Sequence, residues 1–81
     1  MGTEHARALD LARDGKWEES HRLIQSYTDP LACLIHGYLH RVEGDLGNAR
    51  YWYERAGERL PDNALTEELA RLRAAADTRS A

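Results

Sequence analysis

Two histidines four residues apart, His36 and His40, are the side chains in this sequence best placed to do chemistry. Residues at i and i+4 lie on one face of a helix, so both imidazoles can approach the same ion. Glu43 follows His40 after three residues, and Cys33 precedes His36 by three, which adds two ligand-type side chains to that face. An earlier segment supplies His21. We therefore expect a metal or other ligand, if one binds, to be held by this cluster of five residues.

Three interpretations of the cluster remain open. A buried imidazole costs on the order of 1–3 kcal/mol unless its ring nitrogens have partners. A hydrogen-bonded network without an ion, in which one histidine donates to Glu43 or to a backbone carbonyl, would supply those partners, and we favour this interpretation. A divalent metal ion held by His21, His36, His40 and Glu43, with Cys33 as a substitute ligand, is the alternative. The third is general acid–base catalysis by the same residues in a minimal hydrolase or lyase.

The sequence contains no phosphate-binding glycine loop, nucleophile elbow or pair of catalytic carboxylates. These absences favour a protein that is not an enzyme.

Glycine and proline residues at expected helix ends divide the chain into five predicted helices. Alanine, leucine, arginine and glutamate dominate the composition, and these residues favour helix. Asp14-Gly15, Asp29-Pro30, Gly44-Asp45 and Pro61 mark the expected ends and starts. The predicted helices are 3–13, 17–27, 30–42, 46–59 and 62–76, with a loose tail at 77–81.

Loops of a few residues require neighbouring helices to pack as antiparallel hairpins. The sequence thus predicts an all-α single domain over residues 1–81, with hairpins at about 3–28 and 30–60. The helix at about 62–76 would cover the end of the second hairpin. The third helix is apolar on most of its sides, and we expect it to be central and largely buried.

The second hairpin resembles the tetratricopeptide repeat. The matching residues are Gly37, Gly44-Asp45, Ala49, Tyr53, Ala56 and Pro61, all in the register of that repeat. The first hairpin is a weaker copy, offset by 29 residues, in which Gly15 aligns with Gly44 and Trp17 with Leu46. The stretch 36–57 is also similar to a group of small helical proteins without a defined activity. These resemblances imply two tetratricopeptide-like hairpins and a shared site, but no reaction.

In tetratricopeptide proteins the inner groove usually holds peptides, and the resemblance places Leu34, Tyr38 and Arg41 in that groove. Aromatic residues of neighbouring helices would support the histidine cluster: Trp17, Trp52 and Tyr53. We therefore expect a non-enzymatic module that binds a protein or peptide. Self-association through an unmatched repeat face is a further expectation.

Composition limits the other partners. The formal net charge is −3 and no basic face stands out, which argues against nucleic acid. The longest apolar run, 31–35, is far too short to cross a membrane. One cysteine suits a reducing compartment, and we expect a cytoplasmic protein.

Overall fold

The part of the chain that the structure describes forms five α-helices and contains no strand. The computed structural model describes residues 3–80, and the side chains of residues 4–78. The all-α prediction is confirmed. The helices are α1 (Thr3–Arg13), α2 (Trp17–Ile24), α3 (Pro30–Glu43), α4 (Leu46–Arg55) and α5 (Leu65–Ser80).

The ends of α3 form as the sequence predicts. The Asp29 carboxylate accepts a hydrogen bond from the Ala32 backbone N–H at 3.1 Å, and Pro30 occupies the first helical position. At the other end Gly44 adopts φ 87°, a left-handed conformation that glycine tolerates best. Asp45 then caps α4 by accepting a bond from the Asn48 N–H.

Two helices are shorter than predicted. Helix α4 ends at Arg55, four residues before the predicted end, because Gly57 turns into the left-handed region with φ 85°. Helix α2 ends at Ile24, where the Tyr27 N–H donates to the Ile24 carbonyl and closes a turn.

The last helix is displaced along the chain relative to its predicted range. It begins at Leu65, where the Glu67 carboxylate accepts a bond from the Ala64 N–H. It continues to Ser80, through residues for which a loose tail was expected, and Ala81 lies outside the described residues.

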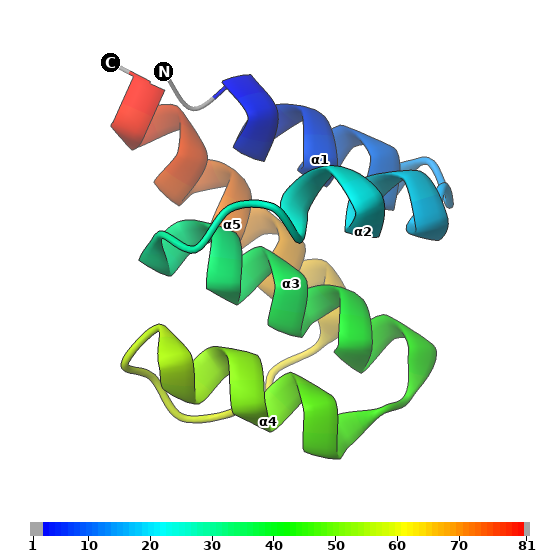
Figure 1. Ribbon diagram of the computed structural model, residues 1–81, viewed down its shortest axis with the longest axis vertical. Coiled ribbons are helices and arrows are strands. Elements are labelled where there is room, and N and C mark those ends of the chain that lie inside the picture. Colours follow the sequence, from blue (N-terminus) through cyan, green and yellow to red (C-terminus); the bar gives the residue numbers. More distant parts are fainter. Residues whose placement is uncertain (1–2, 81) are drawn as a thin grey trace.

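Helix α3 runs through the middle of the molecule and contacts all four other helices (Figure 1). Every residue from 31 to 40 is buried, which agrees with the expected central position. Helices α1 and α2 pack on one side of α3 and α4 on the other, while α5 packs against both α1 and α3. The radius of gyration is 11.1 Å, close to the ~12 Å expected for a compact chain of this length.

A close contact joins α3 to α4. A Cβ atom added at Gly37 would lie 2.7 Å from Cδ2 of Tyr53 and 3.1 Å from the carbonyl oxygen of Ala49. Tyr53 and Ala49 are fully buried, so the contact is enclosed on all sides. The two helices can approach this closely only because position 37 has no side chain.

Polar as well as apolar contacts hold helix α5 against the other helices. Glu68 is fully buried and accepts hydrogen bonds from the Tyr53 hydroxyl, the Asn63 amide and the Arg71 guanidinium. Arg73 also donates to Asp10 and so ties α5 to α1. Among the described residues, no helix is both long and apolar enough to cross a membrane.

Candidate metal centre

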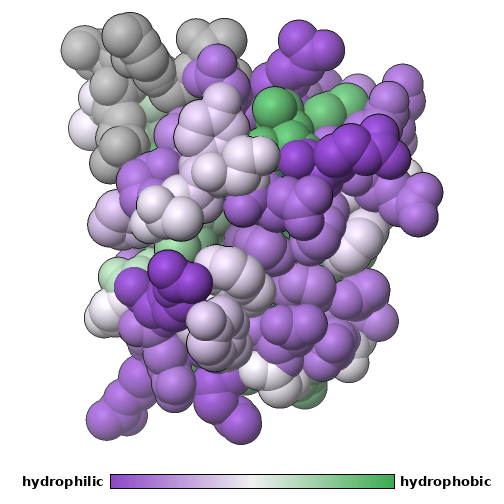
Figure 2. All heavy atoms as spheres, viewed as in Figure 1, coloured by the Kyte–Doolittle hydropathy of each residue, from purple (hydrophilic) through white to green (hydrophobic). Residues whose placement is uncertain are grey.

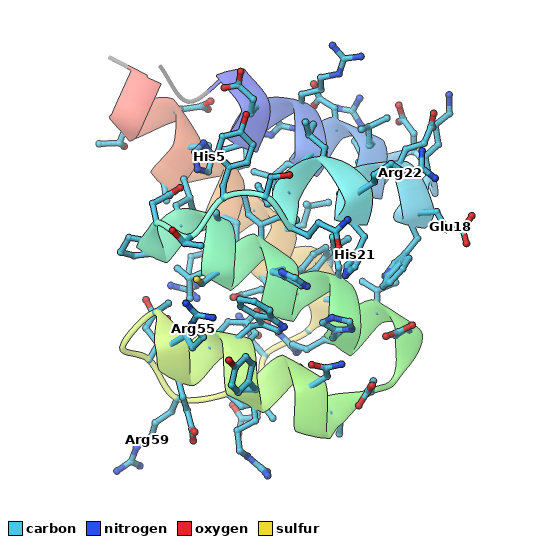
Figure 3. The ribbon with its side chains drawn as sticks, viewed as in Figure 1. His5, Glu18, His21, Arg22, Arg55 and Arg59 are labelled. Carbon is cyan, nitrogen blue, oxygen red and sulfur yellow. The ribbon has the colours of Figure 1, made fainter. Side chains whose placement is uncertain are left out.

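Helices α2 and α3 bring three imidazoles together. His36 and His40 come from consecutive turns of α3, and His21 extends from α2 towards that helix (Figure 3). Each can contribute one ring nitrogen to a group whose members all lie within 4.8 Å of one another. The ring centroids are 4.6 Å apart for His21 and His36, and 5.0 Å for His36 and His40. The sequence predicted this juxtaposition of residues from separate helices.

The two tryptophans of the chain hold the imidazoles in place. The Trp52 ring of α4 stacks on His36, with centroids 3.9 Å apart and planes 13° from parallel. The Trp17 ring stacks on His21 at 4.8 Å and 9°. Trp17 is itself fixed, because its indole N–H donates to the Leu39 carbonyl at 2.6 Å. Each stacked indole limits rotation of its imidazole partner.

A carboxylate orients the third imidazole. Nδ1 of His40 lies 2.6 Å from Oε2 of Glu43, one turn later on α3. An ionised carboxylate can only accept, so Nδ1 carries the hydrogen and donates it. In the neutral ring this leaves the lone pair on Nε2, the nitrogen that remains available to an ion. Glu43 therefore fixes the tautomer of His40, and its own carboxylate lies outside the group of three imidazoles.

Burial favours the uncharged forms of His36 and His21. His36 is 5% exposed, and desolvation, followed by the nearby His21 and His40, lowers its pKa to about 4. The pKa of His21 is lowered for the same main reason. At neutral pH both rings are therefore neutral, which is the protonation state that binds metals.

One buried ring nitrogen of the cluster has no hydrogen-bond partner among the described residues. Nδ1 of His36 is buried and forms no hydrogen bond with any described residue. Leaving a buried polar atom unsatisfied costs on the order of 1–3 kcal/mol. A hydrogen-bonded network without an ion, the interpretation favoured from the sequence, thus gives His40 a partner but leaves Nδ1 of His36 without one.

Cys33 and Tyr53 belong to other parts of the structure. The Cys33 thiol is buried and donates to the Thr28 carbonyl at 3.6 Å, and no group of potential metal ligands among the described residues includes it. Burial raises the pKa of this thiol, which further disfavours a thiolate ligand. The Tyr53 hydroxyl donates to Glu68 at 2.7 Å, and its ring packs beside Gly37. Of the predicted supporting aromatics, only the tryptophans stack on the imidazoles.

The predicted peptide groove is closed. Leu34 and Tyr38 are 8% and 5% exposed, and the Arg41 guanidinium donates to the Asn63 side chain at 3.0 Å. Asn63 lies two residues before the start of α5, whose packing on α3 covers this side of the hairpin.

Two polar groupings near the site were not anticipated. Asp45 joins His40 and Glu43 in a second set of possible ligands, but both acids are exposed and Asp45 already caps α4. His5 is buried and donates to the Asp29 carboxylate at 2.9 Å, which links α1 to the start of α3. No regular spacing connects residues 5 and 29, so no sequence pattern predicted this pair.

Comparison with protein-family models, with curated proteins and with solved structures gave no match to this chain.

Proposed function

We propose that this protein binds one divalent transition-metal ion through His21, His36 and His40. The observation that carries the proposal is the convergence of three ring nitrogens within 4.8 Å of one another. Nitrogens bound at about 2 Å to one ion lie roughly 3.3–4 Å apart, so side-chain shifts of about 1 Å would complete the site.

The donor set favours particular ions. Three imidazoles and no directly contributing carboxylate suit Zn²⁺, Co²⁺, Ni²⁺ or Cu²⁺, whereas Mg²⁺ and Ca²⁺ prefer oxygen ligands. Glu43 supports this role by holding the Nδ1–H of His40, an arrangement typical of carboxylate–histidine–metal sites. His21 is only half-buried, so the ion has a route to the site from solvent.

An ion at this position would fasten α2 to α3. Helix α2 has only eight residues and no side-chain cap at its start, and it packs on α1 and α3 alone. Such a helix gains little stability by itself. An ion coordinated by His21 and by two residues of α3 would link the centre of α2 to α3. The role proposed for the ion is therefore stabilisation of the hairpin packing.

The proposal is tested with protein purified without a polyhistidine tag. Adding Zn²⁺ to the metal-free protein should raise the melting temperature, because an ion that binds only the native state contributes about 2.7 kcal/mol at 100 times its Kd. Exchange of both α3 histidines, His36→Leu with His40→Tyr, should abolish this rise. The fourth histidine provides the matched control: His5→Gln lowers the starting melting temperature but keeps the Zn²⁺-induced rise.

A network without an ion predicts the opposite pattern. The double exchange would then be neutral or stabilising, because shape-matched packing replaces both imidazoles. Equal melting temperatures of the native protein with Zn²⁺ and with a chelator would refute the metal proposal.

We further propose that the hairpins α1–α2 and α3–α4 are tetratricopeptide-like. The enclosed contact of Gly37 with Tyr53 and Ala49 supports this, since small residues at these positions characterise the repeat. A role in binding a protein partner would then need a surface other than the closed groove of Leu34, Tyr38 and Arg41.

A further inference from the structure

The outer side of the α1–α2 hairpin contains a hollow of about 520 Å³. It is lined only by α1, α2 and the turn that follows α2. In Figure 2 hydrophobic residues over this part of the molecule lie among strongly hydrophilic ones. The lining residues are Glu4, Arg7, Leu11, Glu19, Arg22, Leu23 and Tyr27.

Apolar side chains form one part of this lining. Leu11 and Leu23 are half-buried, and Tyr27 is 36% exposed. These side chains leave apolar area in contact with water, and covering it would be favourable by about 25 cal/mol per Å².

Charged side chains without ion-pair partners in the described part of the chain form the rest of the lining. Each helix contributes one acid and, three residues later, one base: Glu4 and Arg7 on α1, and Glu19 and Arg22 on α2. None of the four side chains forms a hydrogen bond or ion pair with another described residue, whereas the side chains of Arg13, Arg71 and Arg73 do. The charges around the hollow are thus free to meet a partner's charges.

We propose that this hollow is the contact surface for a second copy of the chain. A two-fold axis brings the same patch of both copies together, so residue i meets j and j meets i. With this axis perpendicular to α2, the two copies of α2 lie antiparallel across it. Glu19 of one copy then meets Arg22 of the other, and Arg22 meets Glu19. One acid and one base at these two positions make the surface complementary to itself.

The charge balance favours this occupant over others. Two acids and two bases give the lining residues no net charge, so a strongly acidic or basic peptide would meet like charges as often as opposite ones. A copy of the same surface can pair all of them while covering Leu11, Leu23 and Tyr27.

The contact surface is separate from the proposed metal centre. His21 points from α2 towards α3, while Arg22 lies on the other side of the helix (Figure 3). Metal-free protein can therefore be used, and neither proposal depends on the other.

Sedimentation velocity of the metal-free protein, from about 10 µM to about 1 mM, tests the proposal, because a contact of this small size supports only a weak dimer. The native chain should shift from monomer to dimer across this range. Glu19→Arg places like charges at both symmetric contacts and should weaken the dimer at least about tenfold. The double exchange Glu19→Arg with Arg22→Glu reverses the order on both copies and should restore the dimer to within about threefold.

Glu18→Arg is the matched control, since Glu18 neighbours Glu19 on α2 but does not line the hollow. It should leave dimerisation unchanged. Three results would overturn the proposal: a native chain that stays monomeric up to 1 mM, equal weakening by Glu18→Arg and Glu19→Arg, or a double exchange that stays as weak as Glu19→Arg. Circular dichroism of each variant confirms that the helices are intact.

Discussion

Two glycines within helices should respond to alanine with opposite signs. In an exposed helix, replacing glycine by alanine normally stabilises by up to about 1 kcal/mol, because alanine loses less conformational entropy on folding. Gly47 lies in the first turn of α4 with nothing within 4 Å of an added Cβ. Gly47→Ala should therefore raise the free energy of unfolding by about 0.5 kcal/mol.

Gly37→Ala should destabilise. The added Cβ would lie 2.7 and 2.8 Å from two carbons of the Tyr53 ring and 3.1 Å from the Ala49 carbonyl oxygen. Tyr53 cannot move aside easily, because it is fully buried and its hydroxyl is bonded to Glu68. Overpacking of this kind costs typically 1–3 kcal/mol, which exceeds the gain in helix propensity, so a net loss of about 1–2 kcal/mol remains.

Urea unfolding followed by circular dichroism measures both changes. The midpoint should rise for Gly47→Ala and fall for Gly37→Ala, with unchanged slopes. If Gly37→Ala were as stable as the native protein, the α3–α4 contact described here would be wrong.

Two further changes probe the buried titratable groups. The pKa of His36 falls from 6.5 to about 4 on folding. Between pH 6.5 and pH 4 the unfolded chain therefore binds one more proton at this residue than the native protein does. The metal-free protein should therefore lose up to about 3 kcal/mol as pH falls from 6.5 to 4, and His36→Leu should flatten this part of a stability-versus-pH profile. Arg71, Asn63 and Tyr53 outweigh desolvation and lower the pKa of Glu68 to about 2, so its contribution is present above pH 4.5 and lost as pH falls towards 2. At pH 7, Glu68→Gln should lower the free energy of unfolding by about 2 kcal/mol, against under about 0.5 kcal/mol for exposed Glu67→Gln, in urea unfolding.

Local signals carried most of what could be predicted. Asp29-Pro30 and Gly44-Asp45 act within one helical turn, and the structure places the caps of α3 and α4 there. The i, i+4 spacing of His36 and His40 is also local, and helical geometry alone puts them on one face. Burial of α3 followed from its almost continuous apolar character.

What depended on packing between distant segments was harder to predict. Cys33 shares a face of α3 with His36 in a helical projection, but it lies in the first turn and bonds the Thr28 carbonyl that precedes the helix. The groove of Tyr38 was expected to be open because the path of α5 could not be deduced from its sequence.

Glu68 is an instructive omission, since a signal for its burial was present. It follows Leu65 by three residues and precedes Leu72 by four, so it lies on the apolar stripe of α5. An acid in that position needs buried partners, and Tyr53 and Arg71 supply them.

The most direct test of the metal proposal observes the histidine side chains themselves. Long-range ¹H–¹⁵N correlation spectra of uniformly ¹⁵N-labelled, metal-free protein resolve the ring nitrogens of its four histidines. We predict that one equivalent of Zn²⁺ shifts one ring nitrogen each of His21, His36 and His40 and leaves both nitrogens of His5 unchanged. It should also leave Nδ1 of His40 protonated by virtue of Glu43. Spectra that do not change on adding Zn²⁺, or that change only at His5, would contradict the account.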